Sequence, residues 1–400
     1  MPEHTPKQSL EQQKEQQDTA KNGSGNKLKT VRVVAGQKTR RKIRGIEIVA
    51  VTALVALIGA GAAVAAVNSG NNENAKNRQA ASGPAAELRL GYFANVTHAP
   101  ALIGVNDGIL AKRLGSTVLK TQVFNAGPSA IEALNAGAID AAYLGPSPAI
   151  NSYAKSGGES IRIIAGATSG GAQLVVKTSI TSAQQLRGKV LATPQLGGTQ
   201  DVALRSWLAG EGLSTTPSGG GDVTINPTDN ASTLKLFQEG KLDGAWLPEP
   251  WASRLVLQAG AKVLVNEAEL WEKGQFATTI LIVSQKFLEQ HPQTVDALLA
   301  GNTEAIDWLN THPKDAATAV NAALKSAAGK ALPADVIDRS LSELTFTADP
   351  LAATFPKLLQ NGVTAGVGKQ ADLSGIFDLK PLNGILLKAG KPKISAGGLD

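Results

Sequence analysis

From Leu88 onward, short apolar segments alternate with segments of helical character, and this alternation restricts the fold more than any other feature. Leu88–Phe93 and Val118–Phe124 are apolar runs of strand length, and a stretch typical of a helix follows each of them. Strands separated by helices indicate βαβ units, which place their strands in a mostly parallel sheet. The sequence therefore predicts an α/β fold.

The alternation starts a second time after Thr181, so two sheets are predicted. A later apolar run, Thr278–Val283, is expected to return to the first sheet, and the chain from Pro292 onward is expected to be mainly helical. Two open α/β lobes joined by two crossover strands would enclose a cleft. The expected boundaries are 88–174 for the first part of lobe I, 175–278 for lobe II, 279–385 for the completion of lobe I with the C-terminal helices, and 386–400 for a tail.

The composition excludes several kinds of site. The 400 residues exceed what one hydrophobic core usually serves, which agrees with two lobes. The absence of cysteine excludes disulfides, thiolate zinc sites, iron–sulfur clusters, a cysteine nucleophile and a lipid anchor on cysteine. Four widely spaced histidines and the lack of a GxSxG, HExxH or Walker motif give no metal, cofactor or catalytic residue to predict.

The net charge of +6 comes from the N-terminal region alone. Residues 1–87 hold 13 Lys and Arg against 7 Asp and Glu, and the remaining residues hold 26 against 26. A neutral body without a basic stripe argues against a nucleic-acid partner.

The N-terminal region resembles a membrane tether. Residues 1–45 are polar and basic and are predicted to form a disordered cytoplasmic arm. Residues 46–67 are apolar apart from Glu47 and are long enough to span a bilayer, with the globular body outside the cytoplasm. A long, cleavable signal peptide is the alternative, which would make the protein secreted or periplasmic. Residues 68–87 are predicted to be a flexible linker.

Ligands of open α/β sheets bind beyond the carboxyl ends of the strands, where the next helices begin. Free backbone N–H groups and the positive end of the helix dipole favour an anion there. The same residue types are also ordinary helix caps, so each position alone has a structural explanation. In this chain the helix starts are Thr97/His98, Gly127/Ser129, Gly145/Ser147, Gly198/Thr199, Asp229/Asn230 and Glu249.

Three stretches together resemble the nitrate/sulfonate/taurine branch of the substrate-binding proteins of ABC transporters. They are Phe124–Pro128 with Glu132–Asp140, Leu191–Asp201, and Asp243–Ala252. The resemblance implies a type II periplasmic-binding-protein fold that closes by a hinge motion. It also implies an ABC permease and its ATPase as partners, and a small anion as ligand.

Carried over by position, the resemblance places Thr97, His98 and Ser147 around the ligand from lobe I, and Thr199 from lobe II. Glu249 would face the cleft from lobe II, which suggests a ligand that also bears an amine, as taurine does. His98 has a hydrogen bond to the backbone as its alternative role. Trp246 is predicted to be core, whereas Trp251 could close on an apolar part of the ligand. The predicted ligand-binding residues are Thr97, His98, Gly127, Gly145, Ser147, Gly198, Thr199, Gln200 and Glu249.

The sequence thus predicts a non-enzymatic, extracytoplasmic solute-binding component of an ABC importer that captures a small oxyanion. A membrane-tethered ligand sensor is one alternative. An enzyme on the same fold, such as a desulfinase or a pyrimidine-precursor synthase, is another alternative, although those relatives depend on cysteine. Sulfonates, taurine, nitrate and related anions all remain open as ligands.

Overall fold

The computed structural model describes residues 83–400. The arm and the membrane span expected over residues 1–67 lie outside these residues, as does most of the expected linker. Within residues 83–400, no helix is both long enough and apolar enough to cross a membrane. Ala85 is already packed against lobe I, where its backbone N–H donates a hydrogen bond of 2.8 Å to Oγ1 of Thr294.

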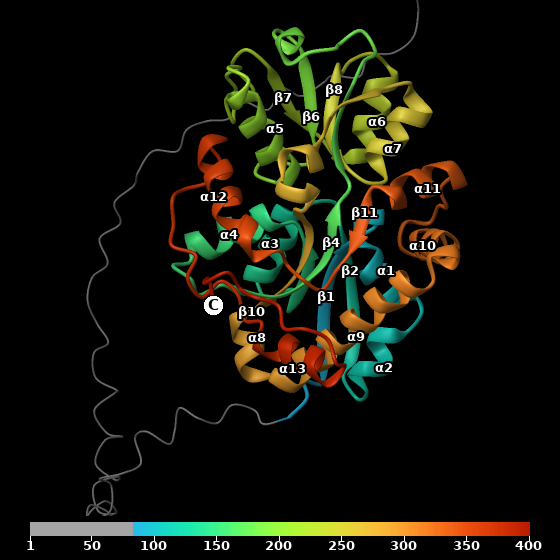
Figure 1. The fold of residues 1–400 in the computed structure, drawn as a ribbon, viewed down its shortest axis with the longest axis vertical. Coiled ribbons are helices and arrows are strands. Elements are labelled where there is room, and N and C mark those ends of the chain that lie inside the picture. Colours follow the sequence, from blue (N-terminus) through green and yellow to red (C-terminus); the bar gives the residue numbers. More distant parts are fainter. Residues whose placement is uncertain (1–82) are drawn as a thin grey trace, which may run out of the picture. The chain divides into compact units, whose positions relative to one another are not determined.

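Lobe I contains a six-stranded sheet in the order β11-β4-β10-β3-β1-β2 (Figure 1). Strand β1 pairs in parallel with β2 and β3, and β10 runs antiparallel between β3 and β4. The prediction of a mostly parallel sheet is therefore right for β1, β2 and β3. It is wrong for β4, β10 and β11, whose pairings are antiparallel. The strands are β1 (Glu87–Phe93), β2 (Val118–Phe124), β3 (Ala141–Leu144), β4 (Ile161–Gly170), β10 (Ala277–Ser284) and β11 (Leu344–Phe346).

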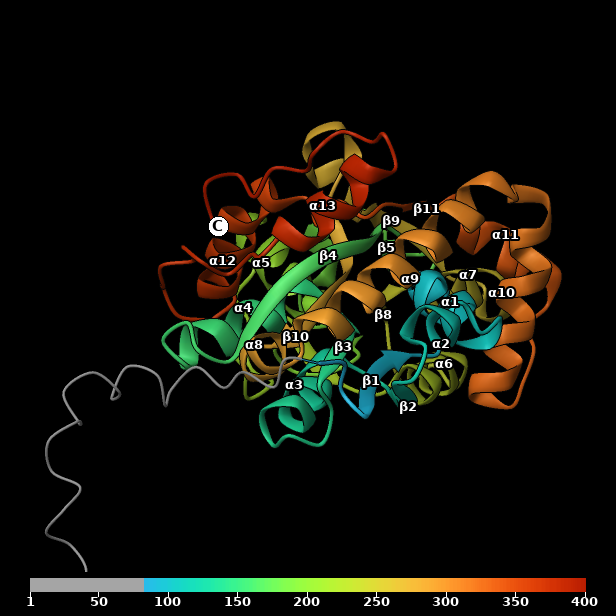
Figure 2. The same ribbon diagram turned by 90° about the horizontal axis from the view of Figure 1, so that it is seen from below.

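Helices cover both faces of the lobe I sheet (Figure 2). One face carries α1 (Ala99–Asn106), α2 (Ile109–Leu114), α9 (Pro292–Thr311) and α10 (Pro313–Ala328). The other carries α3 (Gly127–Asn135) and α4 (Pro146–Lys155), and the short α8 (Gln285–Gln290) follows β10.

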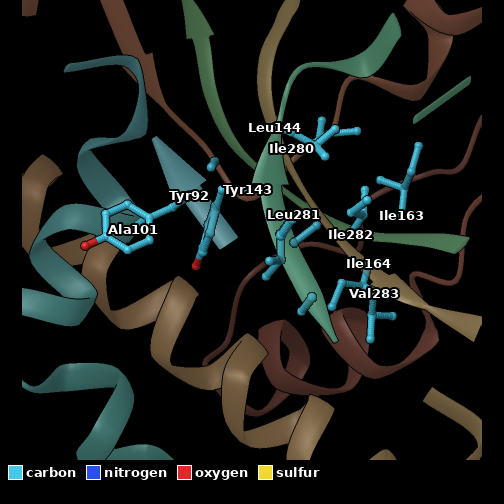
Figure 3. Close-up of a cluster of buried hydrophobic side chains, with 14 of the residues drawn as sticks. Tyr92, Ala101, Tyr143, Leu144, Ile163, Ile164, Ile280, Leu281, Ile282 and Val283 are labelled. Atoms are coloured by element: carbon cyan, nitrogen blue, oxygen red, sulfur yellow. The ribbon is translucent and has the colours of Figure 1, made fainter. Parts of the chain in front are cut away.

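The centre of lobe I is apolar. Figure 3 shows Leu281 and Ile282 of β10 beside Ile163 and Ile164 of β4, and all four are fully buried. Each fully buried aliphatic side chain of this size stabilises the fold by about 1.5–3 kcal/mol. The buried hydroxyl of Tyr143 donates a hydrogen bond of 3.0 Å to Asn302, so its burial does not leave a polar group unpaired.

Lobe II contains a five-stranded sheet in the order β7-β6-β8-β5-β9. The fully buried ring of Trp246 lies in its core, as predicted, and its Nε1 donates a hydrogen bond of 2.8 Å to Glu267. The strands are β5 (Ala172–Val176), β6 (Val190–Thr193), β7 (Thr224–Pro227), β8 (Gly244–Pro248) and β9 (Lys262–Asn266); the helices are α5 (Thr199–Gly210), α6 (Asn230–Gln238) and α7 (Trp251–Ala259).

The chain passes between the lobes at two crossovers. Strand β4 of lobe I continues into β5 of lobe II, and only Gly171 lies between them. The chain returns through residues 267–276 into β10. The chain therefore passes from one lobe to the other a few residues before the expected boundaries, 174/175 and 278/279.

The first crossover requires glycine. Gly170 and Gly171 have φ angles of 85° and 73°, in the left-handed region that other residues rarely adopt. A Cβ atom at Gly170 would collide with the carbonyl oxygen of Glu343, and one at Gly171 would collide with the side chain of Leu344. The two glycines thus let β11 lie directly against the crossover.

The C-terminal helices contact both lobes rather than lobe I alone. Helix α11 (Ala334–Ser342) packs against α7, and α12 (Phe355–Thr364) packs against α5. Helix α13 (Lys380–Lys388) was not predicted. The expected tail belongs to lobe I, since Ala396 is buried and the carbonyl of Leu399 accepts a hydrogen bond of 3.0 Å from the N–H of Gly375.

The helical stretch expected after Leu88–Phe93 is not one continuous helix. A short 3-10 turn over Val96–His98 precedes α1, and Gly108, with a φ angle of 71°, separates α1 from α2. The local pattern stays apolar across this break, so hydrophobic periodicity alone gave no sign of it.

Candidate functional site

A small cavity of about 30 Å³ lies between the lobes. Among the described residues that line it, none is charged. Lobe I contributes Phe93, Asn95, Thr97, His98, Asn125, Ala126, Gly127, Gly145, Pro148 and Thr278, and lobe II contributes Pro194, Gly198, Thr199, Gln200, Asn230 and Pro248. The cavity is therefore neutral and is rich in amide, hydroxyl and imidazole groups.

Most of the predicted site residues meet at this cavity. Those that line it are Thr97, His98, Gly127, Gly145, Gly198, Thr199 and Gln200. Ser147 lies just behind the lining in the first turn of α4. Its backbone N–H donates a hydrogen bond of 3.4 Å to Oγ1 of Thr199, and its buried Oγ has no hydrogen-bond partner among the described residues.

Three helices begin at the cavity without a side-chain cap. The N-cap residues of α3, α4 and α5 are Ala126, Gly145 and Gly198, and none of the three caps its helix through a side-chain hydrogen bond. In α4, however, Pro146 and Pro148 carry no N–H, and the N–H of Ser147 already donates to Oγ1 of Thr199, so the free N–H groups at the cavity belong mainly to α3 and α5. The N–H groups of a first helical turn have no partner within their own helix. Together with the positive ends of the three helix dipoles, these groups favour a negative charge in the cavity.

The two lobes approach each other most closely at Gly145 and Thr199. A Cβ atom on Gly145 would collide with Oγ1 of Thr199 and would lie 3.0 Å from its Cβ. The backbone angles of Gly145, φ −77° and ψ 158°, are accessible to any residue. Glycine is thus required here by the neighbouring lobe and not by the local backbone.

His98 is neutral and has a backbone partner. Complete burial lowers its pKa to about 3, so the imidazole carries no charge near pH 7. Its Nδ1 accepts a hydrogen bond of 3.3 Å from the N–H of Phe93, which places the proton on Nε2. His98 therefore contacts the backbone, but as an acceptor and not as the donor expected for its alternative role, and it also adds an uncharged side chain to the cavity lining.

The expectation that Glu249 faces the cleft is wrong. Its carboxylate forms an ion pair of 3.0 Å with Arg339 of α11 and also accepts hydrogen bonds from Ser340 and from the N–H of Ser253. Burial raises the pKa of this carboxyl group. The partner Arg339 lies 90 residues further along the chain, and nothing near Glu249 in the sequence indicates it. The carboxylate of Glu249 is therefore not available to pair with an amine on the ligand.

Four polar lining residues were not among the predicted ligand-binding residues, namely Asn95, Asn125, Asn230 and Thr278. Asn230 is 6% exposed, and its Oδ1 has no partner among the described residues. A signal existed for two of them. Asn125 directly follows β2 and Asn230 begins α6, which are the positions where ligands of such sheets bind.

A buried ion pair holds the loop that precedes α5. Asp201 accepts hydrogen bonds of 2.9 Å from Oγ1 of Thr193 and from the N–H of Gly197, and it pairs at 3.0 Å with Arg205. Neither side chain of the pair is exposed. The pair therefore positions Gly198 and Thr199 through the backbone, without touching the cavity.

No group of three or more potential metal ligands occurs within residues 83–400.

Two α/β lobes, two crossovers and a polar cavity between helix starts define a fold of the periplasmic-binding-protein class. The chain belongs to the NMT1-like family, whose sequence profile matches residues 81–324.

The predicted resemblance is confirmed by relatives named for the same ligands. The taurine-binding periplasmic protein of Escherichia coli K12 is 27% identical over 210 residues, which are 52% of this chain and 62% of that protein. The alkanesulfonate-binding protein SsuA of Xanthomonas axonopodis pv. citri has a similar fold, with a TM-score of 0.61, 21% identity and coverage of 72% of this chain and 96% of SsuA. The nitrate-binding protein NrtA of Synechocystis PCC 6803 has a TM-score of 0.60, 19% identity and coverage of 70% and 82%.

Proposed function

We propose that this protein is the extracytoplasmic solute-binding component of an ABC importer and that it captures a small oxyanion between its lobes. The observation that supports this most strongly is the neutral cavity at which α3 and α4 of lobe I and α5 of lobe II all begin. Helix N-termini that converge in this way stabilise one negative charge without a cationic side chain. The buried, unpartnered hydroxyl of Ser147 adds a hydrogen-bond donor beside the same cavity.

The head group of the ligand is proposed to be a sulfonate or an anion of similar size, such as nitrate. A cavity of about 30 Å³ holds roughly two water-sized probes, which is comparable with one such group. The uncharged lining has no carboxylate for an amine, so the proposal favours sulfonates over aminosulfonates. Hydrogen bonds that are shielded from water would select an anion with several acceptor oxygens over chloride.

Capture needs no chemical step. A ligand that contacts both lobes favours the closed form only through contacts that the open form lacks. The proposed partners are a permease and its ATPase, which would receive the ligand on opening. The anchor predicted at residues 46–67 stays a prediction.

The close approach of Gly145 to Thr199 provides the test. Calorimetry on the full chain with methanesulfonate and nitrate should detect binding, and G145A should weaken it by about tenfold or more, since the added Cβ keeps the lobes apart. The control is G384A, because Gly384 lies in α13 with no atom within 4 Å of an added Cβ. Undetectable binding of both anions, or equal affinities of G145A and wild type, would overturn the proposal.

A further inference from the structure

A second, much larger pocket adjoins the cavity. Its volume is about 800 Å³, and it is lined by residues of α6 and α7 from lobe II and, from lobe I, by the end of β2 and the connection from α10 to α11. The two spaces share the lining residues Asn95, Asn125 and Asn230. A molecule whose head occupies the small cavity would therefore continue into this outer pocket.

The difference in volume indicates where the rest of a ligand lies. The small cavity has room for little more than a head group, whereas pockets of about 300–1,000 Å³ are typical of sites for whole small molecules. A sulfonate with more than a few carbon atoms needs space outside the head-group cavity. The outer pocket is such a space, and it shares three asparagines with the head-group cavity, whereas another pocket of about 650 Å³ shares only Pro148 with it among the described residues.

The outer pocket is apolar with two cationic side chains. Phe124, Trp251 and Leu332 supply apolar surface, and Val123 is 42% exposed at the same place. The two cationic side chains in the lining are those of Arg254 and Lys330.

The guanidinium of Arg254 lies 4.5 Å from the centre of the Trp251 ring and donates one hydrogen bond, of 3.0 Å, to Gln258. Neither Arg254 nor Lys330 forms an ion pair with any residue in 83–400. The acidic residue of the lining, Asp229, is engaged as the N-cap of α6, where it accepts a hydrogen bond of 3.0 Å from the N–H of Ser232.

We propose that the outer pocket binds the body of the ligand and that the ligand is an organosulfonate with an apolar or aromatic body and a second acidic group. The body lies against Phe124, Trp251 and Leu332, and the second acidic group meets Arg254 and Lys330. This inference rests on the proposed function, because the sulfonate must first occupy the small cavity.

Three probes separate the contributions: methanesulfonate has the head alone, benzenesulfonate adds the body, and 4-sulfobenzoate adds the second acid. Calorimetry on the full chain should show benzenesulfonate binding about tenfold or more tighter than methanesulfonate, because the ring buries apolar surface. 4-Sulfobenzoate should bind about fivefold tighter again.

The variants R254Q and K330A should each reduce the affinity for 4-sulfobenzoate and leave that for methanesulfonate unchanged. Lys330 is exposed in a loop, so K330A keeps the test valid if R254Q fails to fold. The control is K325A, which removes an exposed lysine of α10 that is not part of the lining.

The outcomes are distinguishable. If none of the three probes binds, the proposed function fails together with this inference. If methanesulfonate binds and benzenesulfonate binds no tighter, only the outer pocket is overturned. If R254Q and K330A leave 4-sulfobenzoate binding unchanged, the second acidic group is overturned.

Discussion

Nε1 of Trp251 donates a hydrogen bond of 2.8 Å to Oδ1 of Asn95, so a tryptophan of lobe II is tied directly to an asparagine of lobe I. Asn95 lines both the head-group cavity and the outer pocket, and it is 5% exposed. This contact joins the lobes at the point where the two spaces meet, and we expect it to favour the closed arrangement of the lobes.

W251F removes the N–H group and keeps an aromatic ring. It should weaken methanesulfonate binding by about fivefold, since a typical intramolecular hydrogen bond contributes about 1 kcal/mol to the closed form. The head-only probe avoids any effect on the outer pocket. Calorimetry would measure the change, with W308F in α9 as a Trp-to-Phe control far from the contact between the lobes. An equal loss in both variants would contradict this role of the contact.

The buried pair of Asp201 and Arg205 should contribute strongly to stability. D201A leaves the fully buried Arg205 without its partner, and we expect the free energy of unfolding to fall by about 3–5 kcal/mol. Lys235 and Glu239 have the same spacing on α6 but are exposed, so K235A should cost less than about 0.5 kcal/mol. Urea denaturation of both variants measures the contrast. Similar losses of unfolding free energy in D201A and K235A would show that burial does not determine how much these ion pairs contribute to stability.

The pKa of His98 predicts how stability responds to acid. The pKa is 6.5 in the unfolded chain and about 3 in the folded protein, so the unfolded state binds the proton first. The contribution of neutral, buried His98 to the free energy of unfolding is complete above pH 6.5. It is lost as the pH falls towards 3, at up to about 1.4 kcal/mol per pH unit.

H98Q removes this titration. Between pH 6.5 and pH 5, the free energy of unfolding of wild type should therefore fall by about 2 kcal/mol relative to that of H98Q. Urea denaturation at the two pH values tests this. Parallel changes in wild type and H98Q would mean that His98 does not stay neutral in the fold.

Glu267 should have the opposite pH dependence. Burial raises its pKa from 4.5 to about 7, so the folded state keeps a proton that the unfolded state releases. Its contribution to stability is complete below pH 4.5 and is lost as the pH rises through 7.

E267Q stays neutral and can still accept the hydrogen bond from Trp246. Its stability relative to wild type should rise by about 3 kcal/mol between pH 4.5 and pH 8, measured by urea denaturation. E269Q changes an exposed glutamate of the same 3-10 turn and should alter stability little at either pH. A constant difference between E267Q and wild type would contradict the raised pKa.

The parts of the fold that local chemistry determines were predictable. Proline and glycine mark the element ends: α10 begins at Pro313 and ends before Gly329, and α7 ends before Gly260. Seven of the nine predicted ligand-binding residues line the cavity, because ligand position in open sheets follows from strand direction.

The parts that depend on distant residues were not predictable. Glu249 looked like a ligand contact because its position relative to β8 is right, yet Arg339 withdraws its carboxylate from the cavity. Asn95 lies in the turn after β1, and its importance comes from Trp251, which is 156 residues away in the sequence. Hydrophobic periodicity reports only on local structure, so it does not indicate contacts between residues so far apart in the sequence.

Strand β10 lies in the middle of the lobe I sheet, between β3 and β4, but its residues follow the whole of lobe II along the chain. During synthesis, all of lobe II therefore leaves the ribosome before the strand that joins the two parts of the lobe I sheet exists. Lobe II is one continuous segment with its own hydrophobic clusters, so it can fold first. Until residue 284 has emerged, β3 and β4 keep unpaired edges on which a foreign strand can add. Completion of the lobe I sheet thus waits for a strand that lies beyond the whole of lobe II in the sequence.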